Sequence, residues 1–151
     1  MRNAGPLFAK RRRAQTERPP AIPELKLHMA VAADLRKWAR PEWLWTHFPA
    51  GEKRDGTIGA KLKQMGLQPG WADFIFVSPA GLFHALELKR LGAKLNDNQK
   101  VFRDQCLTIG CPWEMAATIE QAWDVLERWN VMRIRRADPI RPDQAIEAQR
   151  T

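Results

Sequence analysis

Two carboxylates and a lysine stand where two neighbouring strands would bring them together. Asp73 opens an apolar run, a Ser-Pro-Ala-Gly turn follows, and the returning run ends in Glu87-Leu88-Lys89. Side chains alternate along a strand, so Glu87 and Lys89 share a face, about 6–7 Å apart, while Leu88 points to the other face. If the two runs pair as an antiparallel hairpin, Asp73 lies beside Glu87. The sequence therefore predicts two acids and an ammonium in one pocket.

Two adjacent carboxylates suit a divalent cation. An acid is costly to bury unless it is paired, and Mg²⁺ binds one or two carboxylates together with backbone oxygens and waters. The Leu88 carbonyl would lie between the two acids and supply such an oxygen. A bound cation activates water and polarises a phosphoryl oxygen, and Lys89 could orient or deprotonate that water or stabilise negative charge. The alternative is an exposed Glu87–Lys89 ion pair with Asp73 capping a turn, which would contribute little.

Apolar periodicity and turn residues predict the elements that position this cluster. Leu27, Val31 and Leu35 recur at helical spacing, and the run after Asp73 is entirely apolar, which is typical of a strand buried on both faces. The apolar side of the helix at 96–109 is expected to consist of Val101, Phe102, Cys106 and Ile109. Such segments predict an α/β fold with a small mixed central sheet flanked by helices. The predicted order is helix 24–38, strand 43–48, helix 58–65, strand 73–77, strand 82–89, helix 96–109, strand 112–117 and helix 118–129.

The net charge of +8 is concentrated near the two ends of the chain. Residues 1–22 hold six Lys or Arg and one acid, residues 130–151 hold five Arg and three acids, and the part between them is nearly balanced. A run such as Lys10-Arg11-Arg12-Arg13 can contact phosphates without regard to base sequence. The same run would serve equally well as a solubilising tail. Charge alone therefore leaves nucleic-acid binding open.

The length of 151 residues predicts one domain with tails. We expect a basic flexible arm at 1–22, a single domain at 23–129 and an Arg-containing flexible tail at 130–151. No run of about 18 apolar residues occurs, and the basic N-terminus lacks the apolar stretch of a signal peptide, so we expect a cytoplasmic protein with no membrane partner. Two cysteines, Cys106 and Cys111, support neither a disulfide framework nor a zinc site.

Several ordered pieces of the chain resemble one nuclease superfamily. Pro69-Gly70-x-x-Asp73, a hairpin, Glu87-Leu88-Lys89 and then Gln99 on the next helix resemble the PD-(D/E)XK nucleases, and specifically their VRR-NUC branch. The segment 61–66 resembles the family's approach to its first acid, and Gly110-Cys111-Pro112 resembles its turn into the final strand. The resemblance runs from about residue 24 to 129. One departure is Ala72, which stands where the family often has proline, and this puts the turn geometry in doubt.

The resemblance implies a restriction-endonuclease-like core and a role for each matched residue. Asp73, Glu87 and the Leu88 carbonyl would hold Mg²⁺ or Mn²⁺, and Lys89 would be the catalytic lysine. Gln99 would support the active site, and Glu24 matches an acidic position on the first helix that can contribute to it. The implied activity is hydrolysis of DNA phosphodiester bonds, selective for branched DNA such as a Holliday junction or flap. A homodimer and a phage or prophage type of recombination or repair are implied by the same analogy.

Further residues are candidates for substrate contacts. The basic residues ahead of the active-site turn favour phosphate contacts, although ordinary solvated charge explains them equally well. Trp71 beside Asp73 would either stack on an unpaired base or simply pack in the core. His47 is a candidate for lining the substrate groove, whereas His28 and His84 are expected to be structural. The nucleic-acid-binding candidates are Lys10, Arg11, Arg12, Arg13, Lys53, Arg54, Lys61, Lys63 and Trp71.

Two rival functions remain open from the sequence. A non-catalytic nucleic-acid-binding module with a nuclease-like fold would show salt-sensitive binding without metal-dependent cleavage. A nuclease acting on unbranched DNA or on RNA would share the same cluster, because selectivity for nucleic-acid shape depends on loops and dimer geometry.

Overall fold

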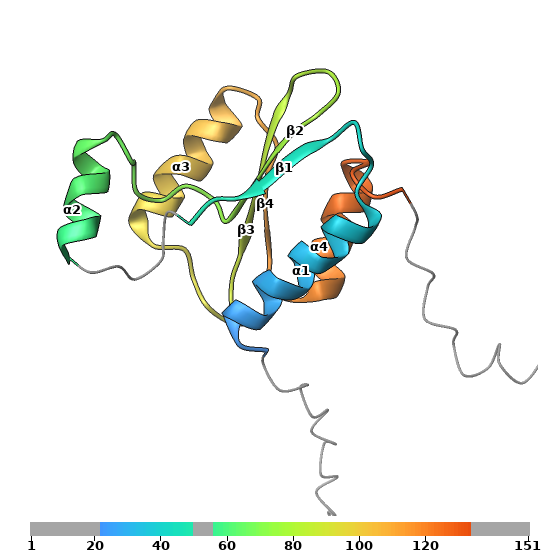
Figure 1. The fold of residues 1–151 in the computed structure, drawn as a ribbon, viewed down its shortest axis with the longest axis horizontal. Coiled ribbons are helices and arrows are strands. Elements are labelled where there is room, and N and C mark those ends of the chain that lie inside the picture. Colours follow the sequence, from blue (N-terminus) through green and yellow to red (C-terminus); the bar gives the residue numbers. More distant parts are fainter. Residues whose placement is uncertain (1–21, 50–55, 134–151) are drawn as a thin grey trace, which may run out of the picture.

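Four strands and four helices alternate along the described part of the chain. The computed structural model describes residues 22–49 and 56–133 (Figure 1). Every predicted helix and strand is present, and the bounds differ from those predicted by no more than two residues. The elements are α1 (Glu24–Trp38), β1 (Leu44–His47), α2 (Gly56–Gln64), β2 (Phe74–Val77), β3 (Phe83–Leu88), α3 (Asp97–Thr108), β4 (Trp113–Ala116) and α4 (Ile119–Arg128).

The strands form one mixed sheet in the order β1-β2-β3-β4. β2 pairs antiparallel with both β1 and β3, and β4 joins β3 in parallel through the crossover helix α3. A parallel neighbour needs such a crossover, whereas β2 and β3 need only the short turn after Ser78. The fold is therefore mixed α/β, with β3 paired on both sides.

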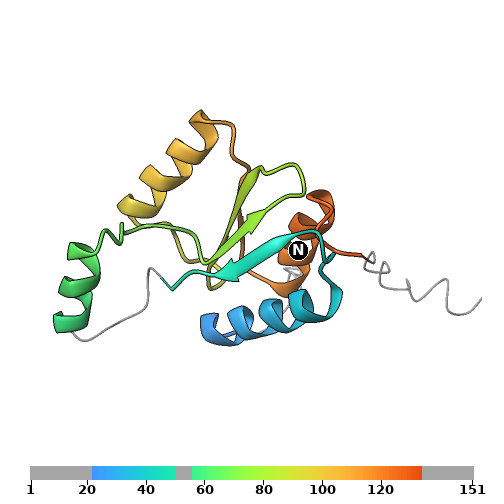
Figure 2. The same cartoon turned by 45° about the horizontal axis from the view of Figure 1, so that its top comes forward.

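Helices α1 and α4 cover one face of this sheet, side by side, and α3 covers the other (Figures 1 and 2). The α1/α4 face holds the larger apolar core, in which Leu27, Val31 and Leu35 of α1 pack on Phe74 and on its neighbours along the sheet. The helical spacing of those three residues thus predicted the buried face of α1 correctly. The indole N–H of Trp123 donates to Asp34, which joins α4 to α1.

The α3 face holds a smaller apolar cluster. Phe102 and Cys106 of α3 pack there on Ala72 and Ala85. The predicted apolar side of α3 was too wide, because Val101 is 55% exposed and Ile109 is 74% exposed. A single helix rests on this face, so only its central residues reach the sheet.

The packed domain continues past its predicted end at residue 129. Val131 and Met132 are buried in the α1/α4 core, and Met132 forms a β-bridge with Ala39. The N–H of Arg40 also donates to the carbonyl of Val131. These contacts tie the segment after α4 to the end of α1, so residues 131 and 132, which the sequence assigns to the tail, pack with the domain.

Helix α2 lies apart from the sheet (Figures 1 and 2). None of the residues of α2 is buried. Among the described residues, no helix has the length and apolar character needed to cross a membrane.

Gly70 holds the loop before β2 against the first turn of α3. Its φ is +89°, and a Cβ built on it would lie 2.4 Å from the backbone carbonyl of Asn98. We expect Gly70→Ala to lower the free energy of unfolding by about 3–5 kcal/mol, because backbone atoms must move apart. Urea denaturation would measure the loss.

Gly92 provides the matched control, since its φ is +83° but nothing lies within 4 Å of its built Cβ. Gly92→Ala should cost only the strain of the left-handed backbone, about 1 kcal/mol. Equal losses in the two variants would show that the contact with Asn98 does not matter.

Candidate active site

Asp73 lies at the end of the sheet, directly before β2. Phe74 is opposite Leu86 in the β2–β3 pairing, which places Asp73 beside Glu87 as the sequence predicts. The Leu88 N–H donates to Asp73 Oδ2 at 2.8 Å. On the other side, the main-chain carbonyl of Asp73 accepts from the N–H of Phe48. Asp73 is thus hydrogen-bonded to both neighbouring segments, through its carboxylate to Leu88 and through its main-chain carbonyl to Phe48.

Glu87 is the one acidic residue of the described chain that is almost fully buried, with 1% exposure. Its Oε1 lies 2.6 Å from the Lys89 ammonium and accepts a hydrogen bond from Gln99 Nε2 at 2.5 Å. The pair is therefore not an exposed surface ion pair. Two donors from different elements converge on one oxygen.

Gln99 links the N-terminal end of α3 to Glu87. Its N–H donates to the Asn96 side chain while its own Oε1 accepts from the Asn96 N–H, which completes a capping box at the start of α3. The amide's other end is then free to donate to Glu87. The residue that caps the helix therefore also orients the carboxylate.

Glu24 comes to the same edge from the first turn of α1. Its Oε2 accepts from the N–H of Arg90, directly after Lys89. The charge of Glu24 raises the pKa values of Asp73, Glu87 and Lys89, as one of the smaller contributions to each. The structure thus brings together all five residues assigned catalytic roles, from α1, α3 and the two central strands.

The electrostatics of the cluster are dominated by burial. Burial and the neighbouring Asp73 charge raise the pKa of Glu87 to about 7, despite the hydrogen bond from Lys89. Burial likewise raises the pKa of Asp73, against the hydrogen bond from Leu88. Burial lowers the pKa of Lys89, but its hydrogen bond to Glu87 and the surrounding carboxylates outweigh this and raise it. The site carries more negative charge than its lysine offsets.

A divalent cation fits that excess of negative charge. The N–H and C=O of a strand residue point the same way, so the Leu88 carbonyl faces the side from which its N–H reaches Asp73. Two carboxylates and a carbonyl are oxygen donors of the kind that Mg²⁺ and Mn²⁺ accept. Asp73, Glu87 and Leu88 therefore offer oxygen ligands of the type that such an ion prefers, at the same end of the sheet.

Two histidines adjoin Asp73 on its other side. His28 Nε2 lies 3.6 Å from Asp73 Oδ2, and His28 Nδ1 lies 3.3 Å from His47 Nε2. His47 was a candidate for the substrate groove, but His28 was expected to be structural and its closeness to Asp73 was missed. The signal was its position one helical turn after Glu24, on the same side of the predicted helix. The third histidine, His84, is packed elsewhere, as predicted.

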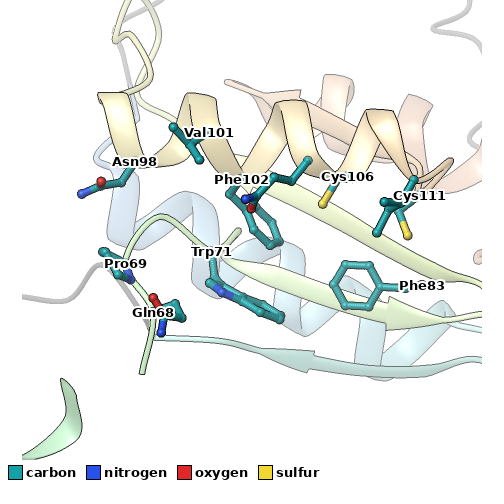
Figure 3. Close-up of a pocket in the computed structure, with 11 residues that line it drawn as sticks. Gln68, Pro69, Trp71, Phe83, Asn98, Val101, Phe102, Cys106 and Cys111 are labelled. Atoms are coloured by element: carbon teal, nitrogen blue, oxygen red, sulfur yellow. The ribbon is translucent and has the colours of Figure 1, made fainter. Parts of the chain in front are cut away.

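Trp71 packs against other rings of the protein, which is one of the two roles that the sequence predicted for it. Its ring stacks on Phe102 with centroids 4.8 Å apart and meets Phe83 edge-on. Figure 3 shows these rings lining a cavity of about 650 Å³ beneath α3, with Gln68 and Asn98 near one end. Trp71 is half-buried there.

Most of the basic candidates for phosphate contacts lie outside the residues that the structure describes. Lys61 and Lys63 are exposed on α2, and no contact in the structure draws them to the acidic cluster. The candidates Lys10, Arg11, Arg12, Arg13, Lys53 and Arg54 lie outside the described residues.

Comparisons of the chain with protein-family models, with curated proteins and with solved structures found no match. The geometry itself defines what the cluster can do. A buried carboxylate, a half-buried carboxylate and an ammonium at one end of the sheet have the chemistry to bind a cation and to stabilise an anionic oxygen.

The raised pKa of Glu87 predicts how the metal-free protein responds to pH. The folded protein holds this proton more tightly than the unfolded chain, so the free energy of unfolding falls as pH rises from 4.5 through about 7. Glu87→Gln removes the ionisation, so the variant should gain up to about 3 kcal/mol over the parent across that interval. Chemical denaturation in the presence of a chelator, at a series of pH values, would measure it.

Glu42, exposed in the turn between α1 and β1, supplies the control. Glu42→Gln makes the same change from acid to amide at an exposed position. If Glu87→Gln and Glu42→Gln show the same pH dependence of the free energy of unfolding, the charge of Glu87 is better compensated than its surroundings indicate.

Proposed function

We propose that this chain is a metal-dependent endonuclease that hydrolyses DNA phosphodiester bonds, similar to the VRR-NUC branch of the PD-(D/E)XK nucleases. The observation that carries the proposal is the convergence of Lys89 and Gln99 on buried Glu87, beside Asp73. Surface ion pairs are solvated and carry little energy, whereas this one is enclosed and shares its carboxylate with a second donor. A buried, incompletely compensated acid with a raised pKa, here near the end of a central strand, is typical of a functional site.

The architecture supports the same proposal at a coarser level. A mixed four-stranded sheet, with the acids on its β2–β3 hairpin and α3 crossing over to β4, is the arrangement that the resemblance leads us to expect. The restriction-endonuclease-like core is part of the proposal. Ala72, which replaces the family's usual proline, is fully buried against the α3 cluster, so its small side chain suits that position.

Asp73, Glu87 and the Leu88 carbonyl would hold Mg²⁺ or Mn²⁺. When bound, such an ion makes water a better nucleophile and withdraws charge from the phosphoryl oxygens. The hydrogen bond from Leu88 holds one oxygen of Asp73, and Gln99 holds Glu87, so neither carboxylate has to be ordered when substrate arrives. Preorganised ligands of this kind reduce the cost of reaching the reactive geometry.

In this scheme Lys89 acts in its protonated form, as an ammonium. The hydrogen bond and charges that raise its pKa favour the ammonium over the free amine, even though burial opposes this. An ammonium orients the attacking water or stabilises the negative charge that develops on the phosphate. Glu24 would complete the acidic edge by holding the backbone directly after Lys89.

The substrate of the proposed enzyme is DNA, and branched DNA in particular. Positive charge concentrated in residues 1–22 and 130–151 would strengthen binding to phosphates of any sequence. A homodimer would place two sites on the two related strands of a junction, in a recombination or repair role of the phage type.

Lys89→Ala provides the direct test. We expect cleavage in Mg²⁺ or Mn²⁺ to fall by at least about 1,000-fold, because the charge on the reacting phosphate loses its nearest cationic donor. Cleavage would be measured on a four-way junction, a flap, single-stranded DNA, duplex DNA and RNA, each with metal and with chelator.

Lys37→Ala, at the opposite end of α1 from Glu24, is the matched exposed-lysine control and should cleave normally. Full activity of Lys89→Ala would overturn the mechanism. Salt-sensitive binding by the parent without cleavage of any substrate would identify a binding module instead.

Deleting residues 1–18 tests the contribution of the basic arm. Six Lys or Arg are removed with one Glu, so DNA binding should weaken and its dependence on salt should become shallower. Fluorescence anisotropy at a series of salt concentrations would measure both. An unchanged slope would show that the arm makes no phosphate contacts.

A further inference from the structure

We infer that His28, His47 and Asp73 form a second cation site, which accepts imidazole-binding metals such as Mn²⁺ or Zn²⁺. One ligand atom from each residue lies within 4.8 Å of the others. Nothing in the proposed nuclease mechanism requires either histidine. Imidazole nitrogens suit transition metals, whereas Mg²⁺ prefers oxygen.

The two histidines are positioned by different elements and by one shared aromatic ring. His28 projects from the second turn of α1, and His47 is the last residue of β1. Both rings meet Phe74 edge-on, with centroids 6.2 Å and 5.3 Å from it. Phe74 is fully buried and follows Asp73 directly, so it fixes the imidazoles relative to the carboxylate.

One nitrogen of the cluster is buried and has no hydrogen-bond partner. This atom is His28 Nε2, and the nearest acceptor, Asp73 Oδ2, is 3.6 Å away. Such an atom is costly to bury, and a cation would use its lone pair. Two ligands of one tetrahedral Zn²⁺ lie about 3.3 Å apart, close to the separation of these two atoms.

A hollow beside the histidines provides access for an ion. A cavity of about 530 Å³ is lined by His28, His47, Phe74 and Arg36, together with apolar residues of α1. An ion can therefore reach the cluster without passing through the acidic edge at Glu87. Arg36 is the basic residue of that lining, at a place where it could meet an anionic ligand of the metal.

Asp73 is common to both proposed sites, since it neighbours Glu87 on one side and His28 on the other. A shared carboxylate is what a two-cation phosphodiesterase needs to hold both ions near one phosphate. This role in cleavage rests on the proposed function, whereas the binding of the metal does not.

Titration of the full-length chain with Zn²⁺, followed through the imidazole nitrogens by NMR, tests the site. The chain has three histidines, and His84 serves as the internal reference. It packs between Trp43 and Trp129, with Nδ1 against the Leu82 carbonyl. We expect coordination shifts for His28 and His47 and none for His84. If either His28 or His47 fails to shift, the three-residue site is wrong.

Calorimetry of variants gives an independent measure. His28→Gln and His47→Gln should each weaken Zn²⁺ binding by at least about tenfold. Met29→Gln, an exposed change on α1 in the same hollow, should not. Unchanged affinity in the double variant His28→Gln/His47→Gln would overturn the proposal.

The cleavage assay separates this site from the nuclease proposal. With both sites correct, the parent should cleave faster in Mn²⁺ than in Mg²⁺, and the double variant should lose that difference. Zn²⁺ coordination by the histidines without cleavage of any substrate would support the metal site and refute the nuclease. Cleavage without coordination shifts at His28 and His47 would support the nuclease and refute the metal site.

Discussion

The structure depends on keeping one carboxylate, that of Glu87, almost entirely away from water. Removing a charged acid from water is costly unless charge and hydrogen bonds replace the lost solvation. Lys89 and Gln99 supply that replacement on one oxygen. Asp73 works against it, since a second carboxylate nearby makes ionisation harder. A bound cation would offset the repulsion between these two carboxylates.

Much of the surrounding fold serves to hold these groups in place. The capping box orients Gln99, and Gly70 lets the loop before β2 approach the helix that carries it. The β2–β3 hairpin sets Asp73 beside Glu87, and the first turn of α1 adds Glu24. Each constraint comes from a different element, so the cluster exists only when all the layers are assembled. Fold and site are therefore specified by the same contacts.

The sequence predicted the elements well because their signals are local. Apolar periodicity, the Asn96 cap and the turn after Ser78 need only neighbouring residues, and the hairpin register then follows from its short turn. The local spacing places His28 one helical turn after Glu24, but its closeness to Asp73 depends on how β1 pairs with β2 and where α1 rests, which that spacing does not encode. The exposure of Val101 and Ile109 was missed for a similar reason, since α3 covers its face of the sheet alone. Prediction from residue types failed where long-range packing decides.

The hydrogen bond from Leu88 to Asp73 has a consequence for how such a protein can change over evolutionary time. The carboxylate takes the place of a main-chain acceptor and continues the hairpin's hydrogen bonding beyond the last residue of the strand. Replacing Asp73 by a residue without an oxygen would therefore loosen the hairpin along with the site, whereas replacing Lys89 would leave the hairpin's own bonds intact. If the proposed nuclease function is correct, a lineage that lost catalysis but kept nucleic-acid binding would be expected to lose Lys89 first and to retain Asp73, because Asp73 also supports the hairpin.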